Sequence, residues 1–152
     1  MIRHLFLVAL AALPLAFAPA RAADDPPVPE TITFVVSTGF WEETPEEDGA
    51  ARRGYYKLIA ERQPDGTALI HLQQIEATAE GPKIATTTVL EEFSALRPYV
   101  TDIRPENSTG ITSQPGLFAT VYLKTDPAAA EPESWTVLID DIGEIKVERA
   151  TN

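Results

Sequence analysis

Aromatic side chains flank an acidic stretch in the first third of the sequence, and their chemistry is that of ligand binding. Phe40-Trp41 precede this stretch and Tyr55-Tyr56 follow it, whereas Trp135 comes much later. Trp and Tyr join a large apolar ring to a hydrogen-bond donor, so rings beside carboxylates would form a stacking surface for a sugar or another amphipathic ligand. Adjacent residues of a strand point to opposite faces, so one ring of each pair is expected in the core. The predicted ligand-binding residues are Trp41, Tyr55, Tyr56 and Trp135.

The acidic stretch itself is a candidate calcium site. Five of the seven residues at 42–48 are Asp or Glu, and calcium prefers several hard oxygen ligands. The candidate ligands are Glu43, Glu46, Glu47 and Asp48. Their spacing lacks the alternating acids and central glycine of a helix–loop–helix calcium site. The favoured interpretation is therefore a solvated loop whose charge discourages aggregation through a sheet edge.

A second acidic group surrounds a glycine near the end of the chain, in the sequence Asp140-Asp141-Ile142-Gly143-Glu144. It lies between two strand-like segments, and Asp and Gly both tolerate the left-handed backbone of a tight turn. We expect a hairpin turn here, with metal binding as the alternative.

Few residue types that perform catalysis are present. The chain has no cysteine, and its two histidines are His4, within the N-terminal segment, and His71. No nucleophile elbow, phosphate-binding glycine loop or zinc-protease helix occurs. A pair of carboxylates across a cleft could still hydrolyse a glycoside. The sequence favours a protein without enzymatic activity and leaves a carboxylate-dependent hydrolase of envelope polysaccharide as the enzymatic alternative.

The charge balance limits the partners of the chain. It carries 23 Asp and Glu against 12 Lys and Arg, a formal net charge of −11. Binding to nucleic acid needs a clustered basic surface that neutralises phosphates, and docking on anionic lipid has the same requirement. We therefore expect a small ligand or an envelope protein as the partner, and no nucleic acid.

The N-terminus has the pattern of an export signal. Arg3 and His4 precede an uncharged apolar run at 5–17, and Ala20-Arg21-Ala22 places small residues where a signal peptidase reads them. The run is too short to cross a bilayer as a helix, and no later segment is long or apolar enough to do so. We expect a signal peptide at 1–22, a periplasmic or secreted protein, and no membrane span after cleavage.

The remaining sequence predicts strands separated by turns. Residues 23–30 form an extended, Pro-rich leader, and one β-domain follows at 31–152. Frequent prolines leave little room for long helices, while abundant Val, Ile and Thr favour strands. Pro64-Asp65-Gly66 predicts a hairpin turn, and the spacing of apolar residues at 89–96 predicts one short helix. Strands are predicted at 31–38, 54–63, 67–77, 84–90, 99–103, 117–125, 134–140 and 144–149.

Seven or eight strands, mostly in sequential hairpins, predict an all-β fold, either a single antiparallel barrel or a sandwich. The leading functional hypothesis is an accessory protein of the bacterial envelope that binds a ligand or a protein at one end of this fold. A structural component that pairs through a sheet edge is a further alternative, with Ile84–Leu90 as the candidate edge. No cofactor is expected, calcium apart.

Overall fold

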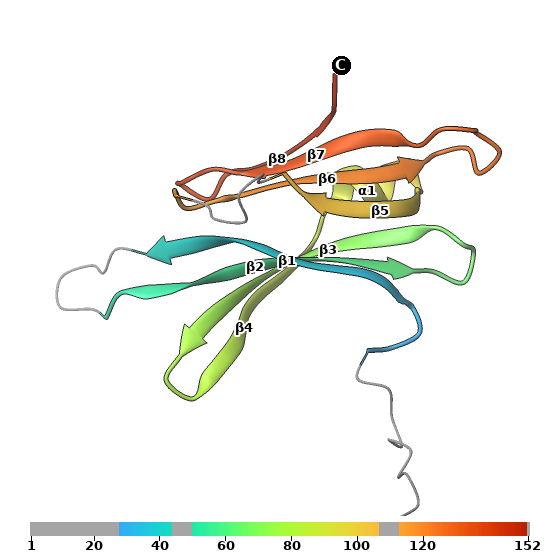
Figure 1. Cartoon of the computed structure of the whole chain (residues 1–152). Helices are drawn as coiled ribbons and strands as arrows, with labels where there is room; N and C mark the ends of the chain where they lie inside the picture. Colours follow the sequence, from blue (N-terminus) through green and yellow to red (C-terminus); the bar gives the residue numbers. More distant parts are fainter. Residues whose placement is uncertain (1–27, 44–49, 107–112, 152) are drawn as a thin grey trace, which may run out of the picture.

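The structure, a computed structural model, describes residues 28–43, 50–106 and 113–151. In these residues the chain is all-β, with two four-stranded antiparallel sheets and one short helix, which confirms the predicted class. The first sheet contains β1 (Ile32–Glu43), β2 (Arg52–Arg62), β3 (Ala68–Thr78) and β4 (Gly81–Val89). The second contains β5 (Tyr99–Pro105), β6 (Leu117–Lys124), β7 (Glu133–Ile139) and β8 (Ile145–Arg149). The strands of each sheet follow the order of the sequence, and Figure 1 shows the sheets as two layers.

One hydrophobic core fills the space between the two layers. Alternate residues of β2 and β6 point into it, as the two-residue period of a strand requires. The core residues of these two strands are Tyr56, Leu58, Ala60, Leu117, Ala119, Val121 and Leu123. The predicted helix is confirmed as α1 (Glu91–Leu96), which places Phe93 in the same core, fully buried. Trp135 of β7 packs edge-to-face against Phe93, with 6.2 Å between the ring centroids.

The two sheets are joined through the backbone at Gly116. Its N–H donates to the carbonyl oxygen of Phe40 at 2.7 Å, and its own carbonyl accepts from the Phe40 N–H at 3.0 Å. Gly116 has a φ of +131°, and a Cβ atom there would collide with the carbonyl oxygen of Ile139. Only glycine allows this backbone approach, which attaches the edge strand β1 to the segment that enters β6.

The predicted hairpin at Pro64-Asp65-Gly66 is confirmed between β2 and β3. The backbone N–H of Gln63 donates to Thr67 across the turn, at 2.8 Å. The Asp65 carboxylate accepts from the Thr67 hydroxyl at 2.6 Å and from the Thr67 N–H at 3.0 Å, and Arg97 reaches it at 2.7 Å. These hydrogen bonds, followed by the charge of Arg97, hold the pKa of Asp65 below its ordinary value.

The lowered pKa of Asp65 predicts a pH-dependent contribution to stability. The folded state favours the ionised carboxylate, so the stabilisation is present above the unfolded pKa of about 4 and is lost as pH falls through the lower folded pKa. Asp65→Asn should lower the melting temperature near neutral pH, and the difference from wild type should close in acid. Thermal melts across this range test the prediction. A difference that stays constant with pH would contradict it.

None of the described helices is long and apolar enough to cross a membrane. The predicted signal at 1–22 and the first part of the leader lie outside the described residues.

Candidate functional site

A cavity of about 260 Å³ opens at the end of the molecule where β1 ends and the β7–β8 turn begins, on the left in Figure 1. We call it the end cavity. Both sheets line it, with the residues Trp41, Glu42, Glu43, Tyr56, Gln74, Pro115, Asp140, Asp141, Ile142 and Gly143. A second hollow of about 320 Å³ shares Pro115, Asp140 and Asp141 with it and continues over Phe118 and Leu138. The two hollows therefore adjoin at these three residues, and the lining of the second includes the apolar residues Leu117, Phe118, Leu138 and Ile139.

Trp41 reaches the end cavity because β1 continues beyond Gly39. The sequence predicted that this strand ends at residue 38, and this prediction is wrong: a register shift between Thr38 and Trp41 carries β1 on to Glu43. Trp41 is only 4% exposed, and its Nε1 donates to the carbonyl oxygen of Ile75 at 3.1 Å. It pairs across the strands with Gly54, which has no side chain to occupy the space of the indole.

Tyr56 and Gln74 lie directly opposite each other on β2 and β3, on the face that points toward the second sheet. Tyr56 is 6% exposed. Burial, and to a lesser extent the Asp140 carboxylate, raises the pKa of Tyr56 above its ordinary value of 10.0. The phenol therefore stays neutral at physiological pH and offers a hydrogen-bond donor at the wall of the end cavity.

The carboxylates of the end cavity differ in their roles. Asp140 organises the turn, since its Oδ1 accepts from the backbone N–H groups of Ile142 at 3.1 Å and Glu144 at 2.8 Å. Asp141 and Glu42 are exposed at the rim. Among the residues that the structure describes, the lining of the end cavity includes four acids and no Lys or Arg. A wall of this composition attracts positive charge.

Arg52 places a positively charged side chain of the protein itself against Trp41 and Glu43, two residues that line the end cavity. Its guanidinium lies 5.7 Å from the centre of the Trp41 ring. It makes two hydrogen bonds to Glu76, at 3.1 and 2.9 Å, and one to Glu43 at 2.8 Å. Stacking on an aromatic face and pairing with carboxylates are the two contacts by which proteins bind organic cations.

The end cavity brings together two of the four predicted aromatic residues, and a separate hollow of about 290 Å³ is lined by Trp41 and Tyr55. Trp41 and Tyr56 both line the end cavity. Tyr55 points to the opposite face of β2, where the Lys57 ammonium lies 6.0 Å from its ring centre. Trp135 packs against Phe93, beside α1. Gln74 and Pro115 were not predicted as ligand contacts, and no local pattern marks them, because tertiary structure brings them to the cavity. Asp140 was predicted only as part of a turn, with metal binding as the alternative.

The residues that the structure describes do not form the predicted calcium site. The Glu43 carboxylate pairs with Arg52, and Glu46, Glu47 and Asp48 lie outside the described part of the chain. Within that part, no three His, Asp or Glu side chains are grouped so that they could hold a metal ion. Asp140-Asp141-Ile142-Gly143 forms a turn between β7 and β8, as predicted, closed by a backbone hydrogen bond from Gly143 to Asp140 at 3.1 Å.

His71 lies away from the end cavity, on the outer face of the first sheet. Its Nε2 is 3.0 Å from the Glu61 Oε2, and its side chain is partly buried. The neighbouring Ile70 and Leu72 point into the core instead. This is the position of a surface histidine with a carboxylate neighbour.

Comparison of the chain with protein-family models, curated proteins and solved structures finds no significant match.

Proposed function

We propose that this chain is a small exported β-protein that binds an organic cation in the end cavity. The observation that carries the proposal is the lining of that cavity: the described residues that line it include Trp41, Tyr56 and four acids but no Lys or Arg, and of those acids Glu43 is paired with Arg52. Aromatic faces and carboxylates together bind ammonium and guanidinium groups. The adjoining hollow over Phe118 and Leu138 suits an apolar stem on the same ligand.

The proposal also includes the export of the protein from the cytoplasm and a sandwich arrangement of its two sheets. The export pattern at 1–22 supports a periplasmic or secreted protein. Two separate four-stranded sheets, with the edge strand β4 exposed along most of its length, support an open sandwich over a closed barrel. A binding cavity at one end of such a sandwich is formed by turns and strand ends, which can vary without disturbing the core.

The hydrolase alternative receives less support. Such an enzyme needs one carboxyl group whose pKa is raised, so that it can donate a proton at neutral pH. Asp65 and Glu76 are the described carboxyl groups with shifted pKa values, and in both the pKa is lowered by hydrogen bonds from neighbouring side chains.

A titration with agmatine tests the proposed function. Agmatine joins a guanidinium and an ammonium through an apolar stem, and in a Trp135→Phe background Trp41 is the only tryptophan that reports binding. We expect a saturable change in Trp41 fluorescence. Asp141→Asn should weaken binding about twofold to fivefold, the range for one partly solvated charge contact.

A matched control is Glu131→Gln, which removes one exposed acid from the β6–β7 loop, outside the end cavity, and should leave the affinity unchanged. The neutral analogue pentanol should give no saturable signal. If agmatine and tetramethylammonium both fail to bind, or if Asp141→Asn and Glu131→Gln weaken binding equally, cation binding in the end cavity is refuted.

A further inference from the structure

Two large apolar side chains lie exposed and next to each other on the second sheet. Phe118 of β6 and Leu138 of β7 are cross-strand partners, and they are 46% and 40% exposed. The residues on either side of them along the two strands belong to the core: Leu117, Ala119, Val137 and Ile139. Phe118 and Leu138 therefore lie on the face of the second sheet that points away from the first. Exposed apolar neighbours that line a hollow are typical of a ligand-binding groove.

The hollow of about 320 Å³ that these two side chains line, which we call the apolar hollow, has its charge at one end. Among the described residues of its lining, Asp140 and Asp141 are the charged ones, and both also line the end cavity. The other lining residues carry no charge: Thr38, Gln114, Pro115, Gly116, Leu117, Phe118, Leu138 and Ile139. A ligand that lies across the junction of the two hollows meets carboxylates there and apolar side chains beyond.

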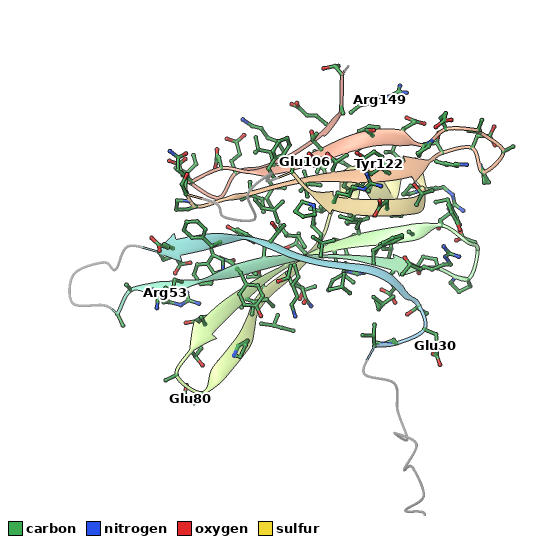
Figure 2. All side chains as sticks on the ribbon, in the orientation of Figure 1. Glu30, Arg53, Glu80, Glu106, Tyr122 and Arg149 are labelled. Carbon is green, nitrogen blue, oxygen red and sulfur yellow. The ribbon has the colours of Figure 1, made fainter. Side chains whose placement is uncertain are left out.

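The surroundings of the apolar pair offer no net attraction to a second charge. Glu106, labelled in Figure 2, lies beside Phe118, since its backbone N–H donates to the Phe118 carbonyl oxygen at 3.0 Å. On the other side, Lys146 of β8 is the cross-strand partner of Leu138. One acid and one base thus flank the pair, and neither is among the residues that line the apolar hollow.

We infer that the ligand of the end cavity is a monocationic amphiphile, with one ammonium group beside Asp140 and Asp141 and an uncharged alkyl tail over Phe118 and Leu138. The inference rests on the proposed function, which places the cationic group in the end cavity. The tail gains free energy when its apolar surface leaves water. A second charged group in its place would lose hydration without a charged partner in the lining, which disfavours diamines and polyamines.

Titration calorimetry with ethyl-, butyl- and hexylammonium tests the inference. Each added methylene should tighten binding about twofold, less than the roughly fourfold of complete burial, because a tail on a sheet face is covered from one side only. Hexamethylenediamine has the same length as hexylammonium and a second charge, and it should bind at least about fivefold more weakly. Hexanol, which has no charge, should show no saturable binding.

Phe118→Ser and Leu138→Ser remove the apolar partners of the tail and leave the carboxylates in place. In each variant the advantage of hexylammonium over ethylammonium should fall from about tenfold or more to about threefold or less. The affinity for ethylammonium should stay unchanged, which also shows that the variant is folded. Ile84→Ser is the matched control, because it truncates an apolar side chain of β4 that is 55% exposed and lies outside the lining of both hollows.

The outcomes separate this inference from the proposed function. If agmatine binds but hexylammonium binds no more tightly than ethylammonium, the alkyl tail is refuted and cation binding in the end cavity stands. Equal effects of Phe118→Ser and Ile84→Ser on the chain-length dependence would also overturn the inference, as would hexanol that binds as tightly as hexylammonium. Failure of every cation to bind would refute the proposed function itself.

Discussion

Replacing Gly54 by alanine should destabilise the protein by about 1–3 kcal/mol, the range for overpacking a well-filled site, and should abolish ligand binding in the end cavity. A methyl group on Gly54 would overlap the carbonyl oxygen of Ile75 and would lie 2.8 Å from the Trp41 Nε1. That oxygen is the acceptor for the Trp41 indole N–H. Either β2 must move away from β3, or Trp41 must leave its position, and both changes deform the cavity wall.

Urea unfolding and the agmatine titration measure the two effects separately. Gly66→Ala is the matched control, because a Cβ atom there meets nothing within 4 Å and the strain comes only from a φ of +84°. It should cost about 1 kcal/mol for placing a side chain in a left-handed conformation and should leave agmatine binding unchanged. If Gly54→Ala unfolds with the wild-type free energy, the close packing of Trp41 over Gly54 is wrong.

The strands, the hairpin and the short helix could be predicted because each has a local signal. Pro64-Asp65-Gly66 fixes a turn through the backbone preferences of its own residues. Alternation of apolar residues reveals a strand wherever one face is buried, as in β2 with Leu58 and Ala60. The end of β1 was predicted wrongly because a glycine within a strand pattern signals either a stop or a bulge. Here pairing with β2 and with Gly116 continues past it.

The end cavity could be predicted only in part. The sequence requires that one ring of the pair Tyr55-Tyr56 points inward, but which one depends on the register of β2, and Tyr56 is the inward one. Trp135, like Val137 and Ile139, is one of the alternate residues of β7 that face inward. Its contact with Phe93 of α1 depends on the order of strands in the second sheet. Asp140 reaches Tyr56 across the two layers, a proximity that no sequence spacing encodes.

Phe93→Ala should be the most destabilising single substitution considered, at about 3–5 kcal/mol for truncation of a fully buried ring. Phe93 has no exposed surface and is the one buried residue of the six-residue helix α1. A helix this short is not stable by itself, so the packing of Phe93 on Trp135 and the core holds it in place. Removal of the ring should leave a cavity in the core and should also free α1 from its packing against the core.

Urea unfolding of Phe93→Ala should therefore show a large fall in stability, and Trp135 should emit at longer wavelength as water reaches it. Glu92→Ala changes an exposed residue of the same helix and should stay within about 0.5 kcal/mol of wild type. A loss below about 1 kcal/mol for Phe93→Ala would contradict the burial of Phe93 in the core. Agmatine binding distinguishes the Phe93→Ala variant from the Gly54→Ala variant. Phe93 lies in α1 and does not line the end cavity, so molecules that remain folded should still bind, whereas Gly54→Ala should lose binding even while folded.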